Sequence, residues 1–141
     1  MTSPYRVLVI EDDTDVGEYL AIVLGKRNGM RVELFRDGFE ALAAWREVDP
    51  DLVITDIELP GISGLDLVAR LREQAPALPV MVLTAHATVD YAIRALRNQV
   101  DEFLVKPVSG PDIAAKAAAL AETGRRRRAG KAAQIVLAVG A

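Results

Sequence analysis

The sequence predicts an α/β fold, in which a doubly wound parallel sheet is covered by helices on both faces. Short apolar runs alternate with longer amphipathic stretches five times between residues 5 and 123. Nearly continuous apolar runs are typical of parallel strands buried on both faces, and connections of helical length between such strands are right-handed. The 141 residues are enough for one domain with its own core.

Five segments are expected to form strands. Four of them are nearly continuous in Val, Leu, Ile or Met, whereas Met30–Phe35 alternates with charged residues and is expected at an edge of the sheet. In chain order the five strands are Tyr5–Ile10, Met30–Phe35, Leu52–Thr55, Val80–Leu83 and Glu102–Val105.

Five further segments show the apolar periodicity of amphipathic helices. They are Asp15–Lys26, Gly38–Val48, Gly64–Gln74, Val89–Asn98 and Pro111–Thr123. Asp15, with Glu18 three residues later, is expected to cap the first helix. Pro111 and Gly124 are expected to mark the start and the end of the last one.

The apolar residues of each expected helix define the face that should pack against the sheet. They are Val16, Leu20, Ile22, Val23 and Leu24 in the first helix, Phe39, Leu42 and Trp45 in the second, Leu65, Leu67, Val68 and Leu71 in the third, and Val89, Ile93 and Leu96 in the fourth.

Composition excludes several classes of site. There is no cysteine, which excludes a disulfide framework, a thiolate metal site and a thiol nucleophile. The single histidine, His86, excludes a multi-histidine zinc site within one chain. No apolar stretch approaches the ~20 residues that span a bilayer, and the N-terminus lacks the apolar centre of a signal peptide. A cytoplasmic location without membrane contact is therefore expected.

Positive charge is concentrated at the C-terminal end. Residues 125–141 hold Arg125–Arg128 and Lys131 and no acid, so they carry +5 of a net charge of −3 and leave −8 for residues 1–124. An acidic body argues against nucleic-acid binding by that body, because such binding depends on neutralising phosphates. The tail has three open interpretations, which are an extension of the last helix, a linker and a disordered end. Its arginines either bind nucleic acid or anionic lipid or, in the preferred interpretation, solubilise a helix end and interact with its dipole.

Acidic side chains follow two of the expected strands. Asp56 comes after Leu52–Thr55 and shortly before a Pro-Gly turn, and Glu11 and Asp12 follow Tyr5–Ile10. Open α/β folds place their ligand sites at the carboxyl edge of the sheet. If both junctions belong to one parallel sheet, three carboxylates converge there, and a hard cation or protons must relieve their repulsion.

Four motifs occur in a fixed order, each at the end of an expected strand. They are Ile10-Glu11-Asp12-Asp13, Thr55-Asp56-x-x-Leu59-Pro60-x-x-x-Gly64, Leu83-Thr84-Ala85 and Val105-Lys106-Pro107. Together they resemble the CheY-like receiver domain of bacterial two-component response regulators, over roughly residues 5–123. The resemblance implies a receiver domain over residues 1–124, followed by the 125–141 tail. It also implies a flavodoxin-like (βα)5 sandwich with a five-stranded parallel sheet of order 2-1-3-4-5.

The resemblance implies a phosphoryl-accepting switch. Asp56 would be the nucleophile and would form an acyl phosphate, a reaction that needs charge neutralisation and positioning above all. Glu11 and Asp12 would help to hold Mg²⁺, for which oxygen ligands are suited. Asp56 itself and the backbone carbonyl of Glu58 would complete the ligands from the protein. Lys106 would pair with Asp56 before the reaction and with the phosphoryl group after it.

Thr84 and Phe103 are the expected switch residues. Thr84 would donate a hydrogen bond to a phosphoryl oxygen, and Phe103, three residues before Lys106, would turn inward. The alternatives are that Thr84 only satisfies backbone groups and that Phe103 is an ordinary core side chain. The resemblance further implies a cis peptide bond before Pro107, while Asp13 is expected only to cap the first helix.

Glu58 and His86 lie two residues beyond Asp56 and Thr84. In receivers these two positions flank the phosphate and tune how fast water removes it. One is acidic here, and the other titrates near neutral pH. An equally weighted alternative is that both are exposed loop residues without a kinetic effect.

Two other functions remain open. A haloacid-dehalogenase-like phosphatase also uses an Asp nucleophile and Mg²⁺, but it requires a second Asp and a Thr where this chain has Glu58 and Pro60. It also requires a cap domain, for which the chain has no room. A pseudo-receiver that binds partners without phosphorylation is disfavoured by the complete set of site residues.

As a receiver, the chain would catalyse only its own phosphorylation and dephosphorylation. Its partners would be a sensor histidine kinase or phosphotransfer protein and a downstream protein or fused output domain. The face made by the fourth helix, fifth strand and fifth helix is also a candidate homodimer surface. No output domain is recognisable after residue 124, so the chain is either a single-domain regulator or a piece of a longer protein. The stretch Tyr91–Pro107 resembles receivers attached to transcriptional or hybrid proteins more than the stand-alone chemotaxis type. The residues that carry this likeness are Ala95-Leu96, Asp101, Phe103-Leu104 and Lys106-Pro107.

Overall fold

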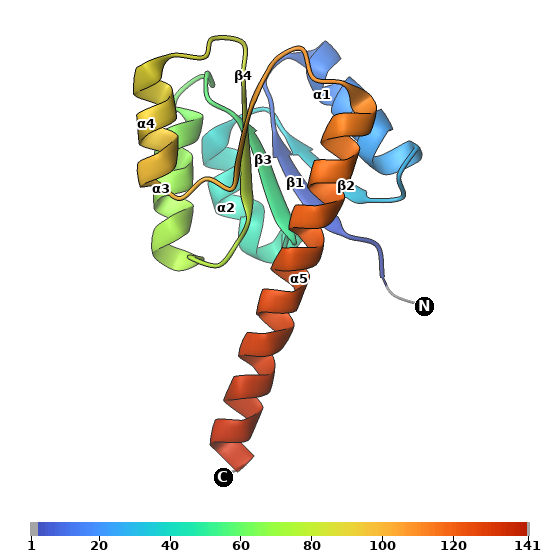
Figure 1. Ribbon diagram of the computed structural model, residues 1–141, viewed down its shortest axis with the longest axis vertical. Coiled ribbons are helices and arrows are strands. Elements are labelled where there is room, and N and C mark those ends of the chain that lie inside the picture. Colours follow the sequence, from blue (N-terminus) through green and yellow to red (C-terminus); the bar gives the residue numbers. More distant parts are fainter. Residues whose placement is uncertain (1–2, 141) are drawn as a thin grey trace.

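The protein is a three-layer α/β sandwich around one parallel sheet (Figure 1). A computed structural model describes residues 3–140. The strand order is β2-β1-β3-β4-β5, and all four strand pairs are parallel, so the expected doubly wound fold and its order are confirmed. The strands are β1 Arg6–Ile10, β2 Arg31–Phe35, β3 Leu52–Asp56, β4 Val80–Thr84 and β5 Glu102–Val105.

Helices cover both faces of the sheet. They are α1 Thr14–Leu20, η1 Ala21–Lys26, α2 Gly38–Val48, α3 Gly64–Gln74, α4 Val89–Arg97 and α5 Gly110–Gly140. Helices α1, η1 and α5 pack on one face, and α2, α3 and α4 pack on the other (Figure 1). η1 continues α1 with wider π-helical turns, as the hydrogen bond from Arg27 N to Ile22 O illustrates.

Alternation along the strands builds a separate apolar core on each face. In β1, Val7 and Val9 belong to the core under α5, while Leu8 and Ile10 belong to the core under α3. β1, β3 and β4 are buried almost throughout because helices cover both of their faces. β2 lies at an edge, as expected. β5 lies at the other edge and is only partly buried, although its apolar run predicted burial on both faces.

The start of the first helix differs from the prediction. The helix begins at Thr14, and Asp13 is its N-cap, accepting a hydrogen bond from Val16 N at 3.0 Å. Asp15 therefore lies in the first turn and is not the cap that the Asp15–Glu18 spacing predicted. An acidic residue in the first turn still stabilises the helix through the dipole.

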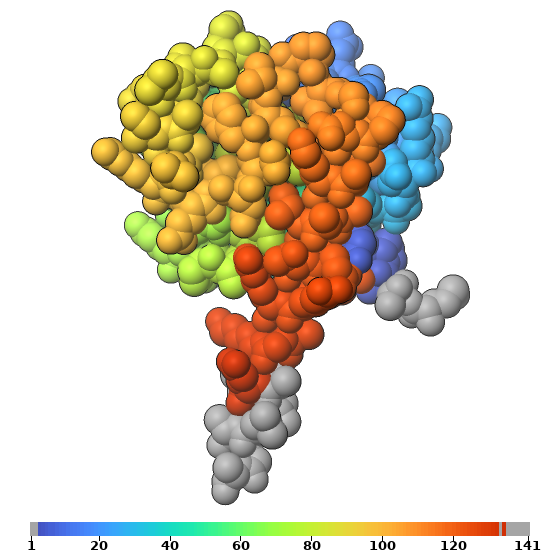
Figure 2. Space-filling view, in the orientation of Figure 1, coloured from blue at the N-terminus to red at the C-terminus, as the bar shows by residue number. Residues whose placement is uncertain are grey.

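The apolar stripe of α4 faces solvent, which corrects the expectation that it packs on the sheet. Val89 is 77% exposed and Leu96 is 80% exposed, and Ile93 is also exposed. Ala95 is the buried residue of this helix. Phe39 on α2 and Ile22 on η1 are likewise exposed, whereas the four apolar residues predicted for α3 are all buried. In Figure 2, α4 (yellow) forms an outer margin of the body.

α5 does not end at Gly124. It continues without a break to Gly140 and leaves the body of the domain as a projecting helix (Figures 1 and 2). Gly124 lies where the helix backbone passes very close to the start of β3, because an added Cβ would lie 2.1 Å from the carbonyl oxygen of Asp51. Glycine is therefore needed here so that the helix can pack closely against β3. The prediction that the helix ends at this residue, which rested on the residue type alone, was wrong. In the part of the chain that the structure describes, no helix has the length and apolar character needed to cross a membrane.

Candidate functional site

The ends of four strands bring the predicted site residues to one edge of the sheet. Asp56 is the last residue of β3 and lies in register with Leu83 on β4. Glu11 follows Ile10, whose partner on β3 is Thr55. Thr84 ends β4, and Lys106 follows β5 directly. The carboxyl ends of the parallel strands meet at a single edge of the sheet, and the side chains converge there as the sequence predicted.

Lys106 bridges two buried carboxylates. Its Nζ lies 2.6 Å from Oε1 of Glu11 and 2.8 Å from Oδ2 of Asp56. Glu11 is 2% exposed and Asp56 is 7% exposed, so both ion pairs are shielded from water. Charge-assisted hydrogen bonds of this length in a low-dielectric site are strong. The sequence predicted the Asp56 contact, but the shorter contact with Glu11 was not foreseen.

Burial and the contacts with one another shift the pKa values of Glu11 and Lys106. Burial raises the pKa of the Glu11 carboxyl to about 7; the hydrogen bond from Lys106 opposes this rise, and the neighbouring Asp56 adds to it. Burial alone would lower the pKa of Lys106, but its hydrogen bonds to Asp56 and Glu11 outweigh burial and raise it. The Lys106 ammonium therefore stays charged at neutral pH. Its single positive charge cannot neutralise all the carboxylates around it.

Glu11, Asp12 and Asp56 form an acidic cluster that suits a hard cation. Their nearest carboxylate oxygens all lie within 4.8 Å of one another, and Asp12 is exposed at the mouth of the site. Among the described residues, Oε2 of Glu11 is buried without a hydrogen-bond partner. Such an oxygen is costly unless something binds it. When Glu11 is ionised, three carboxylates against one ammonium leave two negative charges, so a divalent cation with oxygen ligands fits this donor set.

Hydrogen bonds link Thr84, His86 and Glu58 to one another beside Asp56. Within the described part of the chain, Oγ1 of Thr84 accepts a hydrogen bond from His86 N at 3.0 Å and donates one to His86 O at 3.2 Å. Nδ1 of His86 lies 2.6 Å from Oε1 of Glu58. Glu58 N donates to Oδ1 of Asp56 at 3.2 Å. The loops after β3 and β4 are thus joined by a side-chain contact that the sequence did not predict.

Phe103 lies on β5, half-buried against the core that α3 and α4 cover. Its register partner is Val82 on β4. The Lys106–Pro107 peptide bond is cis, as expected. Phe103 thus occupies a partly open position between the strand edge and the α4 side of the domain.

Gly64 fixes the loop that follows Asp56. A Cβ on Gly64 would lie 1.9 Å from the carbonyl oxygen of Asp56, so the start of α3 lies directly against the end of β3. Gly64 N also donates to Ile57 O at 2.8 Å. The spacing from Asp56 to this glycine is therefore a packing requirement of the site.

Comparison with known proteins identifies the class. The family model described as the response regulator receiver domain matches residues 7–118. The chain belongs to the response regulator receiver domain family. The order of the strands, the acidic cluster and the cis bond beside Lys106 are the structural counterparts of that assignment.

Particular relatives are transcriptional regulators. The chain is 36% identical over 117 residues to the probable transcriptional regulatory protein TcrX of Mycobacterium tuberculosis, covering 83% of this chain and 50% of TcrX. It is 36% identical over 115 residues to the transcriptional regulatory protein QseB of Haemophilus influenzae, covering 82% of this chain and 52% of QseB. The chain thus spans about half the length of the curated relatives it matches.

Solved structures share the fold. The receiver domain of the Francisella response regulator 1452 has a TM-score of 0.75 at 28% identity, over 82% of this chain and 95% of that one. A CheY-like receiver domain protein from Methanospirillum hungatei has a TM-score of 0.83 at 24% identity, over 89% of this chain and 99% of that one. The second likeness shows the fold alone.

Proposed function

We propose that Asp56 accepts a phosphoryl group from a phosphohistidine on a sensor histidine kinase or phosphotransfer protein. The observation that carries the proposal is the position of Asp56 at the carboxyl edge of the sheet, in contact with Lys106 and beside Glu11 and Asp12. Structural ion pairs are seldom built from three converging carboxylates, because like charges repel.

In the proposed step an Asp56 carboxylate oxygen forms a bond to phosphorus as the P–N bond of phosphohistidine breaks. The electron pair of that bond stays on the imidazole nitrogen, which then takes up a proton. Lys106 already donates a hydrogen bond to Asp56. During the transfer its ammonium can donate to the phosphoryl oxygens and stabilise their negative charge. Positioning and charge neutralisation are the main requirements of phosphoryl transfer.

The acidic cluster is of the kind in which receiver domains bind Mg²⁺. In the proposal Glu11, Asp12 and Asp56 hold the ion, and the backbone carbonyl of Glu58 completes the protein ligands. The ion supplies positive charge that shields the carboxylates from the incoming phosphoryl group. The unpartnered Oε2 of Glu11 and the excess of negative charge support this assignment.

The proposed switch begins at Thr84. Its hydroxyl now donates to the carbonyl of His86, so a hydrogen bond to a phosphoryl oxygen requires it to leave that partner. Phe103 would then turn inward on the α4 side of the sheet. The phosphoryl group adds about −1.5 to −2 charge, and the α4–β5–α5 face would carry the change to a partner or output domain. Exposed Val89, Leu96 and Val105 on that face give it an apolar surface suited to a protein contact or a homodimer.

An apolar hollow of about 420 Å³ beside Lys106 is a candidate docking place for the phosphohistidine protein. Tyr19 and Leu20 of α1 line it on one side, and Pro107 and Val108 line it on the other. Tyr19 is exposed and donates a hydrogen bond to Val108 O at 3.3 Å. A partner seated there would bring its histidine to the mouth of the site.

The proposed activity is confined to the domain itself, which would catalyse its own phosphorylation and slow dephosphorylation without turning over an external metabolite. Turnover of p-nitrophenyl phosphate would instead indicate the phosphatase alternative. The relatives named above include transcriptional regulators, and control of transcription through a separate output domain is the corresponding proposal for the whole protein.

The decisive experiment is intact mass spectrometry after incubation with acetyl phosphate and Mg²⁺. The wild-type chain should gain the mass of one phosphoryl group, and Asp56→Asn should gain none. Asp66→Asn, which changes an exposed carboxylate on α3, is the matched control and should be phosphorylated like the wild type. Phosphorylation of Asp56→Asn, or none in the wild type, would remove the proposal.

A further inference from the structure

Asp51 is a fully buried carboxylate that phosphoryl transfer does not use. It directly precedes β3, at the end of the strand opposite Asp56, and is 0% exposed. Its Oδ2 accepts hydrogen bonds from Arg6 N at 2.8 Å and from Arg125 Nη2 at 3.0 Å. Its Oδ1 accepts from Arg128 Nη2. A buried carboxylate is very unfavourable without such partners, so its burial depends on two arginines of α5.

Each of these arginines also binds a further part of the domain. Arg125 donates to the carbonyls of Ser3 at 2.6 Å and Pro4 at 2.8 Å, and its guanidinium lies 4.7 Å from the ring centroid of Tyr5. The α5 helix is thereby fastened to the segment that leads into β1.

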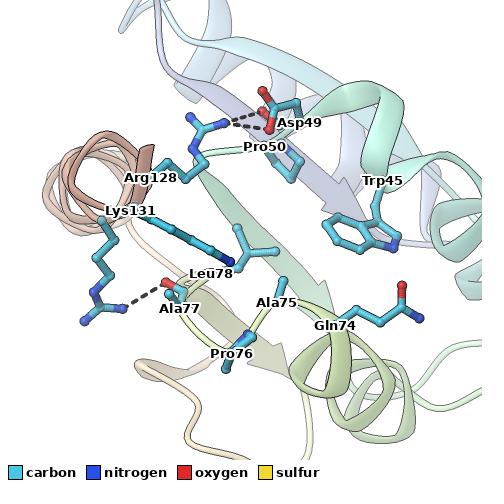
Figure 3. A pocket seen from close by; sticks show the side chains of 12 residues that line it. Trp45, Asp49, Pro50, Gln74, Ala75, Pro76, Ala77, Leu78, Arg128 and Lys131 are labelled. Atoms are coloured by element: carbon cyan, nitrogen blue, oxygen red, sulfur yellow. Dashed lines mark hydrogen bonds and ion pairs between the residues drawn. The ribbon is translucent and has the colours of Figure 1, made fainter. Parts of the chain in front are cut away.

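Arg128 and Arg127 fasten the same helix to two loops on the other side. Arg128 Nη1 donates to Oδ1 of Asp49 at 2.7 Å, in the loop between α2 and β3. Arg127 Nη1 donates to Ala77 O at 3.0 Å, in the loop between α3 and β4. Figure 3 shows the contact between Arg128 and Asp49 as dashed lines. Arg125 and Arg128 are therefore not part of the solvated helix end that composition predicted, whereas Arg126 is exposed.

Apolar packing does not account for the position of the helix on this side. Between α5 and the two loops lies a hollow of about 170 Å³ lined by Trp45, Pro50 and Leu78 among others (Figure 3). The helix backbone touches the body at Gly124, and the arginines span the space beyond. In proteins a helix owes most of its stability to packing against the rest of the fold. Polar contacts must therefore hold this part of α5 in place.

We propose that Asp51, Arg125 and Arg128 form a clamp that makes α5 beyond Gly124 one rigid body with the receiver domain. The clamp fixes the direction in which α5 leaves the base of the sheet. A polypeptide segment or partner protein carried on that helix is then oriented by the domain, and no hinge lies between residues 124 and 128. This role is separate from phosphorylation and does not depend on Asp56.

Because the chain has no cysteine, the proposal can be tested with two spin labels. Exposed Glu47 on α2 and exposed Gln134 on α5 are replaced by cysteine, and the distance distribution between the labels is measured by pulsed electron paramagnetic resonance. The test variant is Arg125→Ala with Arg128→Ala. The control is Arg126→Ala, since the 79% exposed Arg126 pairs with Glu122 of its own helix at 2.9 Å.

The expected result is a narrow distribution in the parent and the control and a broad one in the clamp variant. Amide exchange over residues 125–132 should also become about tenfold faster or more in the clamp variant, while β3 and β4 stay protected. A broad distribution in the parent, no change in the clamp variant, or equal broadening in the control would overturn the proposal. If amide protection is lost in β3 of the clamp variant as well, the single variant Arg128→Ala is compared with the parent and the control instead. In that variant Arg125 still pairs with Asp51.

Discussion

Among the described residues, Lys106 is the one cation that contacts both Glu11 and Asp56, so its charge strongly affects the electrostatics of the site. In the proposed reaction it would have two opposite effects. Its charge would compete with a metal ion for the carboxylates, yet it would stabilise the negative charge that a phosphoryl group brings. A substitution that removes the ammonium separates these effects.

Lys106→Met should therefore bind Mg²⁺ more tightly and accept phosphate more slowly. Loss of one positive charge beside the cluster should tighten Mg²⁺ binding by about tenfold. Loss of a preorganised donor should slow phosphorylation by about 100-fold. Titration calorimetry and timed intact mass measure the two effects. Lys116→Met, which removes a half-buried ammonium of α5 that pairs with Asp112 and Glu102, should change neither. Weaker Mg²⁺ binding in Lys106→Met would contradict the argument.

The contact between His86 and Glu58 predicts a shared effect on the lifetime of the phosphorylated state. The pair joins the loops after β3 and β4, and Glu58 N donates a hydrogen bond to Oδ1 of Asp56, so the pair is predicted to restrict the approach of water. Glu58→Ala and His86→Ala should each shorten the lifetime severalfold, and the double variant should act like either single one, because all three remove the same contact. Loss of phosphoryl mass over time measures this. Asp90→Ala on α4 is the control, and unchanged decay in both single variants would exclude the role.

At the scale of elements, α4 shows what periodicity can and cannot predict. The spacing of Val89, Ile93 and Leu96 predicts one apolar stripe on a helix, and that stripe exists. Periodicity does not determine which way a stripe faces, because that depends on how the helix is placed against its neighbours. Here the small Ala95 faces the core, and the larger residues form a surface. The α3 prediction succeeded because its apolar residues pack directly against buried strands.

Leu96→Ala and Leu71→Ala should differ sharply in their effect on unfolding. Leu71 on α3 is buried, so its truncation leaves a cavity and should lower the free energy of unfolding by about 2–5 kcal/mol. Leu96 is exposed, and its truncation should change stability by less than about 0.5 kcal/mol. Urea denaturation followed by the fluorescence of Trp45 measures both. A loss above about 2 kcal/mol in Leu96→Ala would mean that the stripe packs against the domain.

Two glycines within α5 provide a matched test of why the helix continues past residue 124. Alanine is favoured over glycine in a helix by about 1 kcal/mol. At Gly130, where nothing lies within 4 Å of an added Cβ, the substitution to alanine should therefore stabilise the helix. At Gly124 the same substitution places a Cβ 2.1 Å from Asp51 O, so it should destabilise the domain by about 2 kcal/mol or more. The melting temperatures of the two variants measure this difference in stability. Equal changes in melting temperature would contradict the close contact at Gly124.

For the whole molecule, the features that the sequence predicts best are those that parallel strands impose. Once strands and crossover helices are recognised, the carboxyl ends of the strands must share one edge, so the meeting of Asp56, Glu11 and Lys106 could be expected. The opposite end could not be predicted in this way. Asp51 and Arg128 are 77 residues apart, and their contact depends on where a helix backbone passes over a strand. Composition showed only a run of basic residues.

The balance of charge in the site also affects the stability of the whole domain. Burial raises the pKa of Glu11 to about 7 in the folded chain, with Lys106 opposing the rise and Asp56 adding to it. The stabilising contribution of this group is therefore fully present below about pH 4.5 and is lost as the pH rises through about 7, because the unfolded chain ionises first. Mg²⁺ prefers the ionised carboxylate. Its binding should therefore offset the loss of stability at pH values at which Glu11 is ionised.

The rise in melting temperature that a fixed Mg²⁺ concentration produces should consequently be larger at about pH 8 than at about pH 5.5. Differential scanning calorimetry with and without the ion measures it. In Glu11→Gln, which cannot ionise, the rise should be smaller and should depend less on pH. A rise in the wild type that is equal at both pH values would show that Glu11 does not exchange a proton for the metal, and the acidic cluster would then have to bind the ion through Asp12 and Asp56 alone.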